Sequence, residues 1–386
     1  MRKIIILLVF ICSGIAIQAQ DTLKKFTFDG YTSFMQTVIT DSLWMTQSMF
    51  HNRLNFNWYP IKVLKVNLEV RNRFVYGEMV TMDYAFGEKL SFEDRPIDLS
   101  HNWFSKPSWV LNSMVDRGNV ELTLNKFQLT LGRQRINWAR TFVWNPNDIF
   151  NSYSYFDFDY SERIGVDAIR AVLYTGVSSQ VELVASLGKD TSVKYAGLYK
   201  FNVFNYDIQV LGSFENNSDW TAGLGFEGFI KSVSLRGEAN YYKPIDSVGF
   251  MHDAFLGSIG IDKIFKHDFS VQLEFMYNSQ GKKLPKSLVQ YIDLNELYST
   301  PITAKNPSFD RFNLFVNISK PITPLVSTSL AWMYYIENNM FFVSPNVSVS
   351  LKENLSLSFV GQFFSVAAEK ERVNVLMFFG RLKHSF

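Results

Sequence analysis

Charged side chains alternate with apolar ones in several stretches of the sequence. Among the residues of the chain, these charged side chains are the best candidates for contact with a solute. Every second side chain of an extended chain points to the same side. Cations and acids gather in different stretches, so we expect two charged surfaces with a field between them that orders water and selects solutes by charge. The basic surface would comprise Arg53, Lys65, Arg71, Arg73, Arg135, Arg170, Arg381 and Lys383, and the acidic one Glu182, Asp207, Glu227, Glu238 and Glu274. The alternative is that these residues form ordinary ion pairs between strands.

Hydrolytic chemistry needs a nucleophile, a base and an orienting group within hydrogen-bond reach. The histidines fall in no motif of that kind; they are His51, His101, His252, His267 and His384. The single cysteine, Cys12, lies near the N-terminus. We therefore expect that the protein is not an enzyme and has no catalytic residue and no cofactor. A hydrolase is the least favoured alternative.

The stretch from Leu131 to Asp148 interrupts the alternation. A β-bulge at Gly132–Arg133 would reset the phase and turn Arg135 and Asn137 to the polar side. Asn145 followed by Pro146 predicts the start of a short helix, with the asparagine as its cap. If the strands enclose a pore, such a helix could lie across it.

Tyrosines, phenylalanines and aspartates alternate from Tyr153 to Tyr160. Aromatic faces stack on sugar rings and the acids accept hydroxyl protons, so a glycan site is one hypothesis. A calcium site at Asp157, Asp159 and Glu162 is another, because hard oxygens suit that ion; a small core of the loop itself is the third. We commit to no metal and expect a constriction or solute-contacting loop with these residues: Trp138, Asn145, Asp148, Tyr155, Asp157, Asp159 and Tyr160.

The elements that must position these residues have a period of two and a length of about ten residues. We predict strands at 25–40, 48–59, 61–77, 116–125, 127–138, 165–175, 178–188, 194–204, 205–215, 219–230, 231–243, 253–264, 267–278, 309–320, 324–336, 340–352, 353–366 and 373–385. Every second connection is short, whereas three are very long, at about 78–115, 139–164 and 279–308. Short turns on one rim and long loops on the other are typical of a transmembrane β-barrel of about eighteen strands, with sixteen as the alternative.

The two ends agree with that architecture. Residues 1–19 have the pattern of a signal peptide: Arg2 and Lys3, an apolar run, and a small residue at Ala19. The barrel would occupy residues 20–386 as one domain. The final strand has one apolar and one polar face and ends at Phe386.

Composition excludes other classes. Aromatic residues make up 16% of the chain, while its mean hydropathy is close to zero. Loss of the leader leaves 36 basic and 36 acidic residues, which argues against a nucleic-acid partner. The mean hydropathy close to zero fits a transmembrane barrel, because its lipid-facing and lumen-facing residues alternate and average out.

Two parts of the sequence, the stretch from Gly132 to Asp148 and the last strand, resemble those of a known group of proteins. Gly132-Arg133-Gln134, Trp138 and Asn145-Pro146-x-Asp148 are similar to a motif of porin-like outer-membrane proteins, including the alginate-export and phosphate-selective types, although Ala139 stands where those families usually have glycine. The last strand resembles the closing strand of such barrels, whose terminal aromatic belongs to the signal read by the assembly machinery. The resemblance implies an antiparallel β-barrel acting as a passive channel in the outer membrane of a Gram-negative bacterium, with lipid, the barrel-assembly machinery and small polar solutes as partners.

We therefore expect a channel for small polar or anionic solutes. Oligosaccharides are one class of solute that fits this expectation. The alternative is a binding or adhesion barrel whose lumen is occluded, since long loops at 78–115 and 279–308 carry tryptophans and prolines that indicate ordered structure.

Overall fold

The computed structural model describes residues 24–40, 44–93, 95–151, 155–156, 162–163, 165–189, 191–245, 252–285, 303–369 and 371–386. The expected signal peptide lies outside these ranges. No helix in the described part of the chain is long and apolar enough to cross a membrane.

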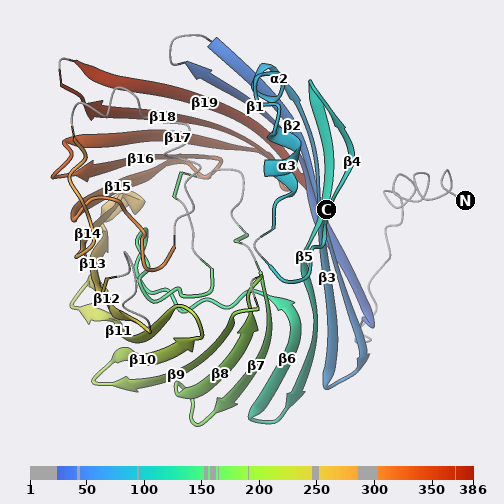
Figure 1. The fold of residues 1–386 in the computed structure, drawn as a ribbon, viewed down its shortest axis with the longest axis vertical. Helices are drawn as coiled ribbons and strands as arrows, with labels where there is room; N and C mark the ends of the chain where they lie inside the picture. The colour runs from blue at the N-terminus through green and yellow to red at the C-terminus, as the bar shows by residue number, and fades with distance from the viewer. Residues whose placement is uncertain are drawn as a thin grey trace, which may run out of the picture.

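The described residues form one antiparallel sheet that curls into a ring (Figure 1). Its strands are β1 (Phe26–Thr40), β2 (Trp44–Ile61), β3 (Leu64–Gly77), β4 (Ser100–Lys106), β5 (Trp109–Leu124), β6 (Phe127–Gln134), β7 (Val166–Tyr174), β8 (Gln180–Leu187), β9 (Val193–Val203), β10 (Tyr206–Glu215), β11 (Asp219–Ile230), β12 (Val233–Pro244), β13 (Ala254–Ile264), β14 (Ser270–Asn278), β15 (Phe312–Thr323), β16 (Val326–Tyr335), β17 (Met340–Lys352), β18 (Leu355–Ala367) and β19 (Arg372–Ser385). Two short helices, α2 (Glu78–Met82) and α3 (Phe86–Ser91), and the 3-10 turn η2 (Lys266–Asp268) complete the described elements.

The ring closes between its first and last strands. β1 pairs with β19 from Tyr31 opposite Ser385 to Thr40 opposite Leu376, so no strand edge remains at this junction. Phe386 continues the pairing, because its backbone N–H and C=O exchange hydrogen bonds of 3.0 Å with Gly30. Closure satisfies backbone groups that lipid could not. The predicted closed barrel of eighteen strands is confirmed.

Strand β4 was not predicted from the sequence, and it is additional to the eighteen strands that were. The lower part of β5 pairs with β6, from Gly118 opposite Arg133 to Leu124 opposite Phe127. The upper part of β5 pairs instead with β4, from Ser100 opposite Met114 to Lys106 opposite Trp109. The predicted start of β5 at 116 and the end of β6 at 138 are therefore wrong, because a hairpin within the first long loop takes the place of β6 in the upper wall.

The two faces of the strands differ as the alternation predicts. Large apolar side chains such as Leu183, Leu224 and Phe359 are exposed on the outer face. Arginine, glutamate, serine and asparagine side chains are buried on the inner face, together with an apolar cluster that includes Trp138, Phe315 and Phe342. This arrangement places the apolar belt toward lipid and the polar groups toward the enclosed space.

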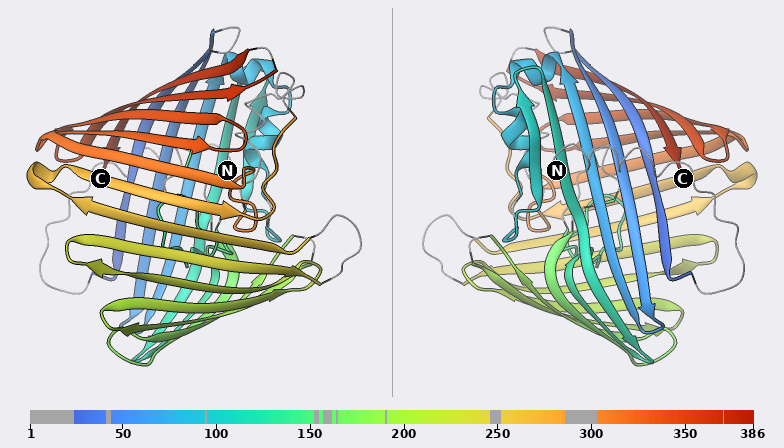
Figure 2. Two further views of the ribbon diagram at one scale, coloured as in Figure 1. Left: turned by 90° about the vertical axis from the view of Figure 1, so that its left-hand side faces the viewer. Right: turned by 90° about the vertical axis from the view of Figure 1, so that its right-hand side faces the viewer.

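The short turns adopt the backbone that their residues favour. Asn125, Asn205 and Lys231 have φ values of 48°, 65° and 56°, in the left-handed region that a two-residue hairpin requires. These short connections join alternate strand pairs, and the long connections lie at the other ends of the strands, as Figure 2 shows.

Candidate functional site

The described part of the long connection between β6 and β7 lies inside the ring of strands (Figure 1). We call residues 135–165 the inward loop. Its described part makes hydrogen bonds with side chains from β8, β10, β12 and β14 and ring contacts with β15, β17 and β18. The described part of the predicted loop at 139–164 therefore enters the space that the strands enclose.

Glu274 of β14 holds the middle of the inward loop. Its Oε2 accepts hydrogen bonds from the backbone N–H groups of Phe142 (2.6 Å) and Val143 (3.1 Å), and its Oε1 accepts one from Trp144 (2.8 Å). Ser258 of β13 donates its hydroxyl to the same carboxylate at 3.0 Å. Such charge-assisted bonds are stronger than neutral ones, so this side chain fixes three successive peptide units.

Glu238 of β12 performs the same task on either side of that segment. It accepts from the backbone N–H groups of Arg140 and Thr141, the latter at 2.9 Å, and from Asn147 at 2.9 Å. Asn240, on the same strand, donates to the carbonyl of Pro146 at 3.0 Å. Backbone groups of an irregular segment must find partners when buried, and these two glutamates supply them.

The start of the inward loop is fixed by its tryptophan. The Nε1 of Trp138 donates to Glu182 of β8 at 2.7 Å, and Gln209 of β10 donates to the carbonyl of Trp138 at 2.8 Å. Arg170 of β7 pairs with the same Glu182 at 2.8 Å. The tryptophan is 1% exposed, so it is a structural anchor of the loop and does not face an open passage.

The later part of the inward loop packs on the apolar wall of β15 to β18. The ring of Tyr155 lies 5.3 Å from that of Phe315, and the ring of Phe156 lies 5.0 Å from Phe342 and 5.1 Å from Phe364. Aromatic contacts at this spacing bury large areas and prefer the edge-on geometry seen here. The predicted small core of the loop is thus shared with the barrel wall, and Tyr155 belongs to it.

Asp148 is an ionisable group buried within the loop. Its Oδ2 accepts from Arg163 at 2.8 Å, and its Oδ1 has no hydrogen-bond partner among the described residues. Burial raises the pKa of Asp148 to about 7, which Arg163 opposes and the charge of Glu238 reinforces. This carboxyl therefore changes charge close to neutral pH.

The predicted helix at Asn145 is not formed. Residues 145–151 contain turns and bends, and the Asp148 N–H donates to the Asn145 carbonyl at 3.1 Å in a single turn. The Asn145 amide donates to Val143 O at 3.2 Å and its oxygen accepts from Thr141. The wall carboxylates compete for the N–H groups that would begin a helix, and this explains the difference. The predicted contact residues Asp157, Asp159 and Tyr160 lie outside the described residues.

Two predicted members of the basic surface are covered. Arg53 pairs with Asp116 and Glu69 and is 2% exposed, and Arg71 donates to His51 Nε2 at 3.1 Å and is 4% exposed. Their side chains point inward, yet neither lines an open passage. The prediction that they line the pore is therefore wrong. For Arg53 the reason is a register shift between β3 and β5 at Glu69–Val70. Asp116 is the extra residue of β5 at this shift, and its carboxylate pairs with Arg53.

The other predicted cations are partly exposed, at varied places. The ammonium of Lys383 lies 3.8 Å above the ring of Tyr31, and Arg381 precedes it on the inner face of β19. Lys65 lies near Tyr59, and Arg73 donates to the Leu90 carbonyl and to Asn112, both at 2.8 Å. Arg135 follows the end of β6 and belongs to the inward loop.

The predicted acidic surface is largely beneath the loop. Glu182, Glu238 and Glu274 point inward as predicted, but loop atoms cover them. Glu227 lies between Arg140 (3.4 Å) and Arg236 (3.3 Å). Asp207 is exposed beside the β9–β10 turn and accepts from Asn202 at 2.8 Å. The acids therefore serve mainly as acceptors for the chain itself, and an exposed acidic face is not what the structure forms.

Arg140 was not predicted from the sequence. Besides Glu227, its Nε donates to Gln209 at 3.0 Å, and Arg236 donates to the Arg140 carbonyl at 3.3 Å. Arg236 also pairs with Asp262 at 3.0 Å and its guanidinium lies 4.2 Å from the ring centre of Phe142. A cation in an irregular loop gives no periodic signal, and this is why it was missed.

The backbone changes conformation at Gly132, but β6 ends at Gln134, so the predicted inward turn of Arg135 and Asn137 along the strand is not formed. This glycine has a φ of 108°, Leu131 is exposed on the outer face, and Arg133 is buried. Pairing of β6 with β5 continues without a register shift, so the predicted bulge is replaced by a change of backbone conformation at Gly132.

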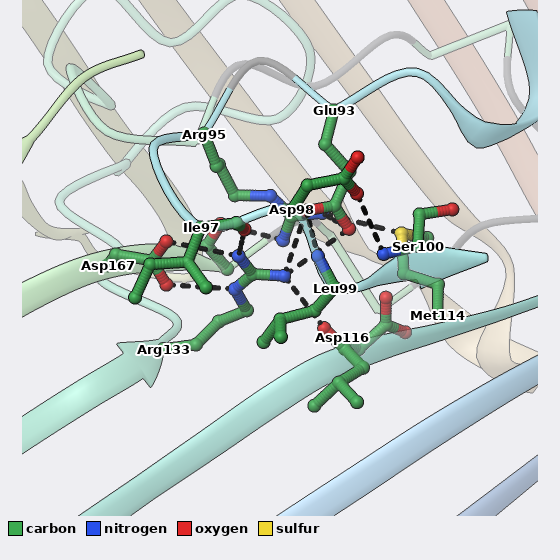
Figure 3. A network of polar contacts seen from close by, with 12 residues as sticks. Glu93, Arg95, Ile97, Asp98, Leu99, Ser100, Met114, Asp116, Arg133 and Asp167 are labelled. Atoms are coloured by element: carbon green, nitrogen blue, oxygen red, sulfur yellow. Dashed lines mark hydrogen bonds and ion pairs between the residues drawn. The ribbon is translucent and has the colours of Figure 1, made fainter.

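Arg133 joins the elements that meet where β6 ends (Figure 3). Its guanidinium pairs with Asp167 of β7 at 2.8 Å and with Glu93 at 3.1 Å, and donates to the carbonyls of Ile97 and Val115. Arg95 pairs with the same Glu93 at 2.7 Å and donates to Gly165 O. This network fastens the first long loop to β5, β6 and β7 where the wall passes from β6 to β4.

A closed antiparallel ring of eighteen strands, an apolar outer belt and a loop fastened within the enclosed space define a transmembrane β-barrel. No protein-family model and no curated protein matches the chain. Among solved structures the chain is similar to outer-membrane porins: OccK11 (OpdR) of Pseudomonas aeruginosa has a TM-score of 0.61 at 8% identity, covering 96% of this chain and 99% of that one. OccAB4 of Acinetobacter baumannii has a TM-score of 0.60 at 8% identity over 94% and 99%, and OccK5 (OpdH) of Pseudomonas aeruginosa has 0.58 at 7% over 94% and 98%. At these identities the likeness concerns the fold.

Proposed function

We propose that the protein is a passive outer-membrane channel for small polar solutes, with a preference for anions. The observation that carries the proposal is the way the inward loop lies on the wall. Loop N–H groups and the Trp138 indole occupy the carboxylates of Glu274, Glu238 and Glu182, whereas Arg381, Lys383 and Lys65 remain partly exposed on the inner face. Neutralised or covered acids and accessible cations favour anions in a confined aqueous space.

The neutral part of the wall supports polar solutes. Inner positions of β14 to β18 in the half near the short turns carry hydroxyl and amide groups in place of charges. They include pairs such as Gln272 with Asn317 (3.0 Å) and Ser348 with Ser358 (3.1 Å). Such groups exchange hydrogen bonds with water and with hydroxylated solutes at low cost. Oligosaccharides are the extension of this proposal that the aromatic stretch at 153–160 suggested.

The partners belong to the same proposal. Lipid would surround the apolar belt, and the barrel-assembly machinery would bind the strand that ends at Phe386.

The test is planar-bilayer conductance of the refolded chain from residue 20 onward, with the reversal potential measured under a salt gradient. Anion selectivity is expected, and the double variant Arg381→Gln/Lys383→Gln should move the reversal potential toward zero. The matched control is Arg53→Gln, whose cation is covered; it is expected to change folding yield more than selectivity. Conductance without selectivity would retain the channel and remove the anion preference. A folded barrel without conductance would favour the occluded binding barrel, and blockage of the current by an added oligosaccharide would identify the solute class.

A further inference from the structure

A row of polar side chains crosses the outer face of β1, β2, β3 and β5, between the large apolar residues of that face. Thr32 lies directly opposite Asn52, Asn52 opposite Asn72, and Asn72 opposite Ser113 in the strand register. The right-hand view of Figure 2 shows these strands side by side on one side of the barrel. We call these four residues the outer polar row.

The members of the row are joined by hydrogen bonds from one strand to the next. Asn52 Nδ2 donates to Thr32 Oγ1 at 3.1 Å, Asn72 Nδ2 donates to Asn52 Oδ1 at 3.2 Å, and Ser113 Oγ donates to Asn72 Oδ1 at 2.6 Å. The indole of Trp103 on β4 extends the series by donating to Ser113 Oγ at 2.9 Å. The row is thus a connected structure spanning five strands.

The row lies within the apolar belt and not at its rim. On the outer face of β2, Phe50 and Leu54 flank Asn52, and on β3, Val70 and Phe74 flank Asn72. A second polar contact, Ser48 Oγ to Gln36 Oε1 at 2.5 Å, lies on the same outer face between β2 and β1. Aromatic anchoring at the membrane surface therefore does not account for these groups.

The remaining strands provide the contrast. Among the described outward positions of β7 to β18, none carries asparagine or glutamine, and the large apolar residues exposed there include Ile169, Leu183, Val210, Leu224, Ile259, Phe275 and Phe359. A barrel surrounded by lipid on every side would have no use for amides on a single sector, because lipid tails offer neither donors nor acceptors.

We infer that this sector is the surface on which a second copy of the chain packs within the membrane. Polar side chains and close packing, not apolar burial, hold proteins together in lipid. An amide both donates and accepts, so the row complements a copy of itself, and Asn72 has a second amide hydrogen beyond the one given to Asn52. Symmetric self-association is the commonest form of protein assembly, and a self-complementary row suits it.

The mass of the refolded chain in detergent micelles, measured by analytical ultracentrifugation over a range of protein-to-detergent ratios, tests this inference. The natural sequence is expected to form an oligomer. The double variant Asn52→Leu/Asn72→Leu should associate at least tenfold more weakly while keeping its conductance for each barrel and the change of gel migration on heating that marks a folded barrel. The control Thr328→Leu, which removes a polar group from the outer face of β16, should leave the mass unchanged.

A chemical measurement guards against misfolding of the double variant. The chain from residue 20 onward has no cysteine, because Cys12 is its single one. A short bifunctional thiol reagent is expected to link copies carrying Asn72→Cys and not copies carrying Leu224→Cys. A monomeric mass at every ratio, equal association of the leucine variant, or equal linkage of the two cysteine variants would overturn the inference.

Discussion

The carboxylate of Glu274 accepts hydrogen bonds from three successive peptide N–H groups of the inward loop, and this makes it the most informative single residue to change. Glu274→Gln keeps the size of the side chain but replaces one acceptor oxygen by a donor and removes the charge. Hydrogen bonds to a charged group contribute about 1.5–3 kcal/mol each, so loss of one such bond should raise the population of the detached loop about tenfold or more.

Single-channel recording checks this expectation as larger and more frequent current fluctuations. The matched variant Asp262→Asn removes an inward carboxylate that pairs with Arg236 and makes no hydrogen bond or ion pair with the described part of the inward loop. It should leave the fluctuations unchanged. Equal fluctuations in the two variants would show that the carboxylate of Glu274 does not hold the loop.

Asp148 gives the inward loop a pH dependence whose sign is fixed by burial. Its pKa in the packed loop is about 7, above the ordinary value of about 3.9 for an aspartate. The packed loop therefore binds the proton more tightly than a detached loop. Its stabilisation is fully present below the ordinary pKa and is lost as the pH rises through about 7. Current fluctuations should accordingly increase between pH 6 and pH 8, both values being about one unit from that pKa.

The variant Asp148→Asn removes this titration while keeping a neutral side chain of similar shape. Its fluctuations should depend less on pH over the same interval than those of the natural sequence. An undiminished pH dependence in the asparagine variant would assign the titration to another group.

At the level of the element, Gly132 determines how β6 ends. Its φ of 108° is a conformation that side chains rarely adopt, and a Cβ there would lie 2.4 Å from the carbonyl oxygen of Gly118. Gly132→Ala should destabilise the barrel by about 1–3 kcal/mol and displace Arg133 from Asp167 and Glu93. The urea midpoint of the refolded protein measures this loss.

Gly212→Ala on β10 is the control for that substitution. A Cβ at Gly212 would lie 3.5 Å from the Thr221 carbonyl, which is an ordinary contact. Its urea midpoint should stay close to that of the natural sequence. If both variants lost the same stability, the special backbone of Gly132 would have no separate role.

The elements were predictable from the sequence to the extent that they depend on local pattern. Alternation and short turns such as Asn125–Lys126 specify the strands and their pairing, because neighbours in the chain are neighbours in the barrel. Strand β4 was not predictable, since Ser100–Lys106 does not alternate and pairs with β5 where β6 is absent. The bonds of Glu238 and Glu274 to the inward loop were equally hidden: a glutamate facing the lumen and one that binds a loop have the same local sequence.

The whole molecule divides into two unlike sectors. One sector, from β7 to β18, is apolar outside and holds the inward loop inside through carboxylates, amides and aromatic rings. The other, from β19 through β5, contains the partly exposed Lys65, Arg381 and Lys383 inside and the outer polar row outside. This division separates the proposed path for anions from the surface that supports the loop, and it places the proposed contact between copies on the outer side of the same sector as that path.

Phe386 lies where the first and last strands pair, and changing it can distinguish assembly in the cell from folding of the barrel. Its backbone exchanges hydrogen bonds with Gly30 in any variant, whereas its ring lies 5.9 Å from that of Phe28 on the exterior. If the ring is read by the barrel-assembly machinery, Phe386→Ala should lower the amount of folded barrel in the outer membrane several-fold, yet refolding into detergent should be nearly normal because a half-exposed ring contributes about 1 kcal/mol. Phe28→Ala removes the partner ring and serves as the control: it should lose as much stability as Phe386→Ala without the loss of assembly in the cell. Equal assembly of the two variants would mean that the terminal ring only packs against its neighbour and carries no signal.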